Sequence, residues 1–289
     1  MKIAILGVHG FIGRNLSELL LNNGHEITGY VLDHELERGS QFECKSVTKL
    51  LRSKFTEKFK YDVTINLAAR RSTRSQPLTE SQVNEFTYEI PKEFILRTTS
   101  PQTLVLNACT YIQNYKGFTG QSVDSYGAAK ERISTFLKKE SLVGRFTTKD
   151  LFFFTLYGPG DQPNHLVPLL LNAARTGAPI SLSPGHQLMN LMYVDDAARN
   201  ILKSISYRNN GSYVKYYLWS DDYLTVRQLV LRIQSATGQK INCRWGDRDY
   251  VGHEMMEPWP IPMQQLPEFE ASISLEEGIT RTWKAIETD

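Results

Sequence analysis

Short apolar runs alternate with helix-spaced apolar positions over the first two thirds of the chain. The first six residues form an apolar run that ends at Gly7, which predicts a buried strand. From Phe11 to Asn22 the apolar residues recur at helical spacing, and Asn23-Gly24 ends that helix. Further strands are predicted at residues 25–32, 61–68, 104–107, 152–156 and 191–194. Further helices are predicted at residues 49–59, 83–98, 126–139, 166–176 and 196–205.

The alternation of strands with helices of this length predicts an α/β fold with a parallel sheet covered on both faces. The pattern changes after Gly211, where aromatic residues cluster, a helix follows at 225–237, and a proline-rich stretch runs over 257–266. This change predicts a smaller C-terminal lobe rather than more of the same sheet.

Charge and cysteine content narrow the class of protein. The 289 residues carry 33 Lys and Arg against 31 Asp and Glu, and a net charge of +2 argues against a nucleic-acid partner or a polybasic membrane surface. Cys44, Cys109 and Cys243 are isolated, which argues against a metal site and a disulfide framework. The apolar runs are shorter than the roughly 18 residues of a membrane span. We expect a cytoplasmic protein that is not attached to a membrane.

The turn after the first strand contains three glycines in the segment Gly7-Val8-His9-Gly10-Phe11-Ile12-Gly13. A helix N-terminus presents unpaired N–H groups and a positive dipole end, which attract a pyrophosphate. Gly7 permits the tight turn, Gly10 lets the backbone approach phosphates, and Gly13 lets the helix pack on the strand. A glycine-rich turn without a ligand is the alternative, but the strand–turn–helix context favours nucleotide binding.

The end of the second strand predicts which dinucleotide binds. An acidic side chain there accepts a hydrogen bond from the ribose 2′-hydroxyl, whereas a basic neighbourhood accommodates a 2′-phosphate. The position falls near Val31, which is neutral, with Asp33 two residues later and His34 and Arg38 beyond. This pattern favours NADP(H) over NAD(H), although Asp33 would be the acceptor in a register shifted by two.

Tyr126 and Lys130 stand four residues apart at the start of a predicted helix, so both side chains share one face. A nearby ammonium lowers the pKa of a phenol, which makes the tyrosine a usable proton donor or acceptor. The same lysine can reach the ribose hydroxyls of a nicotinamide nucleotide. Surface pairs of this kind are common, but the glycine turn upstream favours a catalytic pair.

Seven short motifs together resemble one family. They are GxxGxxG at 7–13, Asn66-Leu67-Ala68-Ala69, Val83-Asn84, YGAAK at 126–130, LYGPGD at 156–161, YVDD at 193–196 and SLEEG at 274–278. This combination is similar to the extended short-chain dehydrogenase/reductases, in particular the NAD(P)-dependent epimerase/dehydratase group that acts on nucleotide-linked sugars.

The resemblance implies a Rossmann-type doubly wound parallel sheet with a smaller C-terminal substrate-binding domain. We place the dinucleotide-binding domain at residues 1–160 and 190–210, and the substrate-binding domain at 161–189 and 211–289. The resemblance further implies that Tyr126 is the acid/base, that Lys130 supports it, and that the protein forms a homodimer. The implied cofactor-binding residues are Gly7, Gly10, Phe11, Ile12, Gly13, Leu67, Ala68, Ala69, Asn84, Tyr126 and Lys130.

The chain departs from the family pattern after the strand 104–107. The family's third catalytic residue is a Ser or Thr, and the strict register puts Ala108 there, with Thr110 two residues on. Side chains alternate along a strand, so Thr110 would lie on the same face and is the candidate, while a threonine that only closes a turn fits equally well. The Asp-Glu pair of the family's dehydratases is replaced by Cys109-Thr110 or Tyr111-Ile112, which disfavours dehydration.

A second departure concerns the substrate's diphosphate. The family places an arginine where this chain has Met189, whose apolar side chain offers no donors to phosphate. Arg244 and Arg248 are the replacement candidates, although two solvated surface charges fit as well. With Asn164 they complete the predicted substrate-binding residues.

These observations favour an NAD(P)H-dependent reductase of a nucleotide-linked 4-keto-6-deoxy sugar, similar to the CDP-abequose and CDP-paratose synthases. In it Tyr126 protonates the developing alkoxide while Thr110 polarises the carbonyl. The alternatives are a nucleotide-sugar epimerase with tightly bound NAD, and a non-catalytic dinucleotide-binding protein on the same scaffold.

Overall fold

The computed structural model describes residues 1–31, 47–49, 60–72, 76–117, 121–207, 211–219, 221–251 and 254–288. The chain forms two compact units. The first comprises Met1–Phe153, Ala198–Leu218 and Ile261–Phe269. The second comprises Phe154–Ala197, Trp219–Pro260 and Glu270–Asp289.

The first unit contains an eight-stranded sheet in the order β13-β10-β6-β5-β4-β1-β2-β3. Its described pairings are all parallel. The order reverses direction at β1, which is the arrangement of a doubly wound Rossmann-type sheet and confirms that prediction. The strands are β1 (Lys2–Leu6), β2 (Glu26–Val31), β3 (Val47–Lys49), β4 (Val63–Asn66), β5 (Leu104–Thr110), β6 (Thr147–Phe153), β10 (Tyr213–Leu218) and β13 (Gln264–Gln265).

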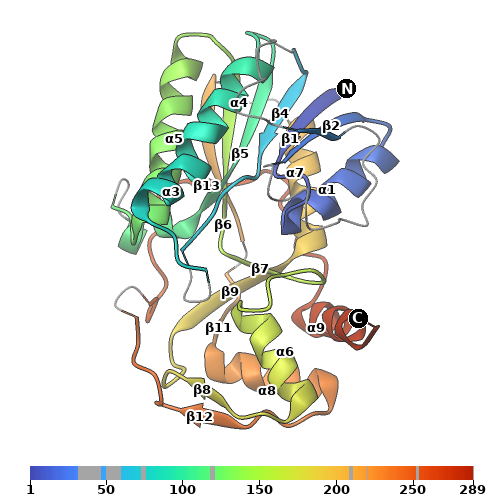
Figure 1. Ribbon diagram of the computed structural model, residues 1–289, viewed down its shortest axis with the longest axis vertical. Coiled ribbons are helices and arrows are strands. Elements are labelled where there is room, and N and C mark those ends of the chain that lie inside the picture. Colours follow the sequence, from blue (N-terminus) through green and yellow to red (C-terminus); the bar gives the residue numbers. More distant parts are fainter. Residues whose placement is uncertain are drawn as a thin grey trace. The chain divides into compact units, whose positions relative to one another are not determined.

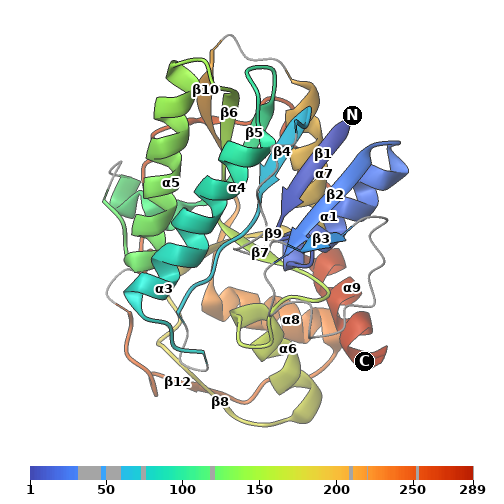
Figure 2. The same cartoon turned by 45° about the horizontal axis from the view of Figure 1, so that its top comes forward.

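Helices cover both faces of this sheet, and Figures 1 and 2 show the α3–α5 group apart from α1. A chain of short helices replaces the predicted helix 83–98, because a π-helical turn interrupts it at Glu85–Glu89. On one face α4 and α5 bury a cluster that includes Phe94, Ile133 and Leu137. The helices of this unit are α1 (Phe11–Asn22), α3 (Glu80–Asn84), α4 (Ile90–Thr98), α5 (Ser125–Leu142) and most of α7 (Val194–Ser206).

The apolar run 1–6 is predicted to be a buried strand, and Ile3, Ala4, Ile5 and Leu6 of β1 are indeed fully buried. Parallel strands in the middle of such a sheet are covered on both faces, so they need apolar residues at consecutive positions. The predicted helix 49–59 lies outside the described residues, except for Lys49, which ends β3.

The two compact units differ from the predicted domain boundaries. Residues 211–218 and 261–269 belong to the first unit, and residues 154–160 and 190–197 belong to the second. Tyr213–Leu218 form β10, which pairs in parallel with β6 along its whole length. The aromatic run Tyr213, Tyr216, Tyr217 is typical of a strand, and Tyr216 and Leu218 bury their side chains in the sheet. The proline-rich stretch also contributes the two-residue strand β13, which extends the sheet beyond β10.

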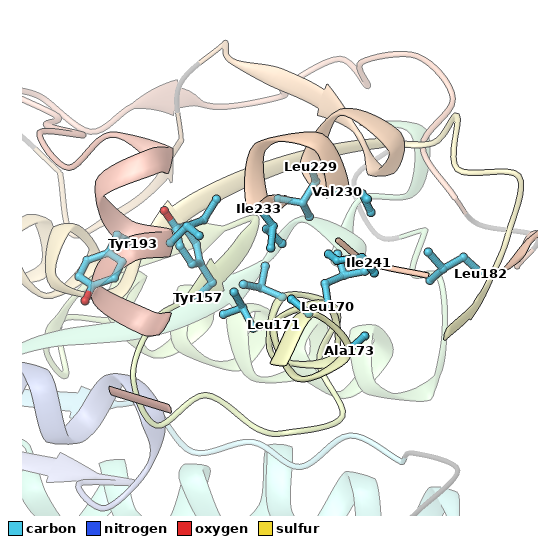
Figure 3. Packing of buried hydrophobic residues seen from close by; sticks show 13 residues of the cluster. Tyr157, Leu170, Leu171, Ala173, Leu182, Tyr193, Leu229, Val230, Ile233 and Ile241 are labelled. Carbon is cyan, nitrogen blue, oxygen red and sulfur yellow. The ribbon is translucent and has the colours of Figure 1, made fainter. Parts of the chain in front are cut away.

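The second unit has two small sheets, β11-β9-β7 and β12-β8, and three helices. Figure 3 shows its core, where side chains of α6 such as Leu170 and Leu171 lie opposite Leu229 and Ile233 of α8. The strands are β7 (Thr155–Tyr157), β8 (Ile180–Leu182), β9 (Leu188–Tyr193), β11 (Tyr223–Thr225) and β12 (Cys243–Trp245). The helices are α6 (Leu166–Thr176), α8 (Val226–Thr237) and α9 (Leu275–Thr288).

Candidate active site

The glycine turn between β1 and α1 leaves no room for side chains. Gly7 has a φ of +85°, which glycine adopts without strain. A Cβ on Gly13 would lie 2.2 Å from the Gly7 carbonyl oxygen, so α1 begins directly against the turn. Gly10 is the N-cap of α1, and Phe11 and Ile12 follow it in the first turn. The N–H groups of Gly7 and Gly10 already donate to the carbonyls of Tyr30 and Gly7, and the first turn of α1 contains no acidic residue.

The segment after β4 passes close to this turn. A Cβ on Gly7 would lie 3.2 Å from both the Ala68 nitrogen and the Leu67 carbonyl carbon. The Leu67 N–H donates to the Leu6 carbonyl at 3.0 Å, which continues the β1–β4 pairing by one step. The structure therefore brings the predicted cofactor-binding residues Gly7, Leu67 and Ala68 together, and Ala69 is next in the chain. Because the two backbone segments approach this closely, a Cβ on Gly7 would crowd the Leu67-Ala68 backbone. Binding of a dinucleotide at this turn stays a prediction.

Asn84 lies elsewhere in the same unit. It ends α3, and its Oδ1 accepts a hydrogen bond from Nη1 of Arg132 on α5 at 2.5 Å. This contact ties α3 to the helix that carries Tyr126. Binding of a cofactor by Asn84 stays a prediction.

Helix α5 positions Tyr126 and Lys130. Asp124 is its N-cap and accepts from the Gly127 N–H at 2.8 Å, so the helix starts one residue before the tyrosine. Lys130 is 2% exposed, and its Nζ donates to the Ala108 carbonyl at 2.7 Å and to the Ala68 carbonyl at 3.4 Å. Lys130 thus ties α5 to the ends of β4 and β5, beside the glycine turn.

The electrostatics of the pair differ from the expectation that Lys130 lowers the pKa of Tyr126. Burial raises the pKa of Tyr126 to about 12, and the cation that acts against burial is Arg71, while Asp124 and Cys109 add to the rise. Burial also lowers the pKa of Lys130 to about 8, against the opposing influence of Cys109 and Asp150. The expectation is wrong for the protein alone, because the loss of water around the phenol outweighs the charges near it.

Arg71 was not predicted from the sequence. Its guanidinium carbon lies 6.0 Å from the centre of the Tyr126 ring, and its Nη2 and Nε donate to Asp124 Oδ2 at 2.8 and 3.1 Å. The only signal in the sequence is the pair Arg70-Arg71 directly after the Ala68-Ala69 motif. Nothing in that spacing indicates a contact with a helix more than fifty residues further along the chain.

Thr110 ends β5. Ala108 and Thr110 are half-buried while Asn107 and Cys109 are buried, so the alternation puts Ala108 and Thr110 on one face as expected. The Thr110 hydroxyl accepts from the Gln113 N–H, and the Thr110 N–H donates to Gln113 Oε1 at 2.9 Å. This is the turn-closing arrangement, and a catalytic role for the hydroxyl stays a prediction.

A row of buried polar side chains crosses the sheet behind these residues. Asn66 Nδ2 donates to Asn107 Oδ1 at 2.8 Å, and Asn107 Nδ2 donates to Asp150 Oδ1 at 2.8 Å. The Tyr213 hydroxyl donates to the other Asp150 oxygen at 2.6 Å. The row runs over β4, β5, β6 and β10, and Asn66, Asn107 and Asp150 are fully buried.

The predicted substrate-binding residues belong to the second unit. Asn164 is exposed in the turn before α6. Arg244 is exposed on β12, opposite Ser181 of β8, and the Arg248 N–H donates to the Leu182 carbonyl at 3.2 Å. The two arginines therefore lie at the end of the same small sheet. Their binding to a substrate stays a prediction.

The YVDD motif anchors helix α9 within the second unit. Asp196 is 1% exposed and accepts three hydrogen bonds, from the Ser272 N–H and hydroxyl and from the Ile273 N–H. Asp195 pairs with Arg281 of α9 at 3.5 Å. Asp196, the second aspartate of the motif, thus has a structural role: it holds the loop at residues 272–273 that precedes α9.

The described residues contain neither a cluster of metal ligands nor a helix that could span a membrane. Within that part of the chain no group of three or more His, Cys, Asp or Glu side chains is placed to hold a metal ion. Across the same ranges, none of the helices combines the length and apolar character that a membrane span needs. The residues Asp33, His34 and Arg38, which bear on the choice of dinucleotide, lie outside the described residues.

Comparison with known proteins assigns the family. The profile of the NAD dependent epimerase/dehydratase family matches residues 3–217. The chain belongs to this family, which lies within the extended short-chain dehydrogenase/reductases, as the resemblance predicted.

Relatives within the family differ in activity. The chain is 26% identical over 273 residues to CDP-abequose synthase of Yersinia pseudotuberculosis, covering 89% of this chain and 92% of that protein. It is 23% identical over 243 residues to a probable UDP-glucuronate 4-epimerase of Rhizobium meliloti, covering 70% and 67% of the two chains.

Solved structures share the fold. The UDP-glucuronic acid 4-epimerase of Bacillus cereus, in complex with UDP-glucuronic acid and NAD, has a TM-score of 0.80 at 17% identity, covering 100% of this chain and 99% of that one. MoeE5 in complex with UDP-glucose and NAD has a TM-score of 0.79 at 19% identity, with the same coverage.

Proposed function

We propose that the protein is a reductase of a nucleotide-linked 4-keto-6-deoxy sugar that uses a nicotinamide dinucleotide. The observation that carries the proposal is the anchoring of Lys130 on the carbonyls of Ala68 and Ala108, which holds the Tyr126 helix beside the glycine turn. The likeness to CDP-abequose synthase over nearly the full length of both chains supports the substrate class.

The glycine turn and the segment after β4 would hold the dinucleotide. Gly7, Gly10 and Gly13 give its diphosphate access to the N–H groups of α1, and Leu67, Ala68 and Ala69 line the segment beside them. When bound, the dinucleotide supplies the hydride of the reduction.

Tyr126 then supplies the proton. Its pKa of about 12 keeps the phenol protonated at neutral pH, which is the state that a proton donor needs. As charge develops on the sugar oxygen, the phenol hydroxyl gives that oxygen its proton. Arg71 supplies positive charge near the resulting phenolate. Lys130 is the proposed support of the tyrosine, and Thr110 is the proposed donor that polarises the carbonyl.

The finer proposal concerns the cofactor. Val31 is 1% exposed, so its neutral side chain is not available to a ribose, and the choice falls to residues after β2. His34 and Arg38 would favour the 2′-phosphate of NADP(H), whereas Asp33 would favour the free hydroxyl of NAD(H). We propose NADP(H). A titration of the protein with NADPH and with NADH, followed by cofactor fluorescence, tests this choice.

The test uses purified protein, NADPH and CDP- or dTDP-4-keto-6-deoxyglucose. The wild type consumes NADPH in proportion to the sugar, and Tyr126→Phe lowers kcat by about 100-fold or more while NADPH affinity, followed by cofactor fluorescence, stays the same. Tyr88→Phe, which removes the hydroxyl of another half-buried tyrosine, is the matched control and keeps full activity. Undiminished turnover by Tyr126→Phe would refute the mechanism.

An epimerase is the second candidate, because the relatives found include a UDP-glucuronate 4-epimerase of Thermodesulfobacterium geofontis and the probable one of Rhizobium meliloti. In that reaction the hydride leaves the sugar and returns, so the cofactor spectrum is the same at the end as at the beginning. Interconversion of UDP-glucuronate and UDP-galacturonate by the protein with bound NAD⁺, without net formation of NADH, would decide for this candidate.

A further inference from the structure

A charged pair stands beside the Tyr126 ring. Arg71 is 47% exposed and Asp124 28% exposed, and they meet through two hydrogen bonds to Asp124 Oδ2. The other carboxylate oxygen, Oδ1, accepts from the Gly127 N–H and so caps α5. Asp124 therefore has two tasks: it begins the helix that carries Tyr126, and it holds a guanidinium over the ring of that tyrosine.

We propose that Arg71 is a positioning residue that governs how readily the Tyr126 hydroxyl gives up its proton, and that Asp124 moderates its influence. The proposal rests on the proposed function, in which Tyr126 is the proton donor. Arg71 acts through its charge on the phenolate, and no contact of Arg71 with a substrate is needed.

Three ionisable groups face Tyr126 from different places in the fold. Arg71 belongs to the segment after β4, Asp124 precedes α5, and the buried thiol of Cys109 lies on β5. Arg71 favours the phenolate and Asp124 disfavours it. Burial raises the pKa of the Cys109 thiol well above its ordinary value, so the thiol carries no charge near neutral pH. Lys130, on the same helix, directs its ammonium to the carbonyls of Ala68 and Ala108.

Because Arg71 and Asp124 carry opposite charges, substitutions at the two positions can distinguish an electrostatic effect on Tyr126 from a purely structural role of the ion pair. Arg71→Met removes the cation and leaves the Asp124 carboxylate, so it should raise the pKa of the phenol. Asp124→Asn removes the anion, keeps an oxygen that can cap α5 and leaves Arg71 in place, so it should lower the pKa. An ion pair that only holds the loop to the helix predicts the same direction of damage from both changes.

The magnitude follows from the separation. The Arg71 guanidinium carbon lies 6.0 Å from the centre of the Tyr126 ring. A unit charge about 6 Å away, at an effective dielectric between that of water and about 20, shifts a pKa by about one pH unit. Arg71→Met should therefore raise the pKa of the phenol by about one pH unit, and Asp124→Asn should move it in the opposite direction. The double variant, which removes both charges, should return close to the parent.

The experiment places 3-nitrotyrosine at position 126 in the full-length chain by amber suppression. Its phenolate absorbs visible light, where tyrosine and tyrosinate do not, so its ionisation can be followed separately from that of the other tyrosines. We expect an upward shift for Arg71→Met, a downward shift for Asp124→Asn, and a value near that of the parent for Arg71→Lys. Arg145→Met is the control for a change of net charge, since it removes an exposed cation that follows α5 and pairs with Glu140 of that helix, and it should leave the titration unmoved.

Shifts of the same sign in Arg71→Met and Asp124→Asn, or shifts no larger than that of Arg145→Met, would overturn the proposal. The titration needs no turnover, so it is independent of whether the sugar is reduced or epimerised. If Tyr126→Phe keeps full activity, the proposed function fails while the titration still measures the influence of Arg71. If Tyr126→Phe is inactive and the titration does not move, only the present inference fails.

Discussion

Replacing Lys130 by methionine tests how much the buried ammonium destabilises the folded protein, separately from the activity that it supports. Lys130 is 2% exposed, and burial lowers its pKa to about 8 from an ordinary 10.5. A gap of about 2.5 between the two pKa values corresponds to about 3 kcal/mol of unfolding free energy that the charged side chain costs the folded protein. Methionine has a similar length and carries no charge, so the variant avoids this cost while losing activity.

The sign of the pH dependence follows from the direction of the shift. Below pH 8 the lysine is charged in both the folded and the unfolded chain, and the full cost is present. Between pH 8 and 10.5 the folded protein has released the proton that the unfolded chain still holds, so the stability of the parent rises with pH. The variant also loses the hydrogen bonds to the carbonyls of Ala108 and Ala68. We expect this loss to lower its stability by an amount that does not change with pH.

Urea denaturation of the parent and of Lys130→Met, measured from pH 7 to pH 10, tests this reasoning. The stability of the variant relative to the parent should fall by about 2–3 kcal/mol over that range. Lys138→Met, an exposed position on the same helix, should show a difference that is flat with pH. A flat difference for Lys130→Met would mean that the ammonium is as well solvated in the folded protein as in the unfolded chain.

Two further substitutions test the turn and the YVDD motif. Gly13→Ala puts a Cβ 2.2 Å from the Gly7 carbonyl oxygen, so we expect a loss of about 2–3 kcal/mol in unfolding free energy and of measurable NADPH binding. Gly211→Ala is the neutral control, because its Cβ would make only an ordinary van der Waals contact, 3.8 Å from the Tyr213 carbonyl oxygen. Unchanged cofactor affinity in Gly13→Ala would remove the turn from the binding site. Asp196→Ala deprives the loop at residues 272–273 of a buried acceptor of three hydrogen bonds, and should cost about 3–5 kcal/mol in urea denaturation; a cost below 1 kcal/mol would mean that water replaces the carboxylate.

Sequence patterns were sufficient to predict those features that are formed by residues close together in the chain. The strand, glycine turn and helix at the N-terminus could be predicted because all three lie within about twenty residues, and their roles follow from backbone geometry. The spacing of Tyr126 and Lys130 was readable for the same reason, since residues four apart share a helix face.

Features made by tertiary contact were not readable. Arg71 meets Asp124 across 53 positions of the chain, and the pattern around either residue is that of an ordinary surface charge. Residues 213–218 were assigned to the wrong part of the molecule, because an aromatic run predicts a strand but says nothing about which sheet it joins. The direction of the Tyr126 pKa was missed because burial, which decides it, depends on the packing of the whole unit.

The buried row Asn66–Asn107–Asp150 has a consequence for how the strands align during folding. These three residues are directly opposite one another in the pairings β4–β5 and β5–β6. A slip of one residue in either pairing would turn an amide or carboxyl away from its partner and leave it without one in an apolar interior, at a cost of several kcal/mol. The row therefore favours a single register of the strands. That register also sets the positions of Ala68, Ala108 and Thr110 at or just after the carboxyl ends of β4 and β5.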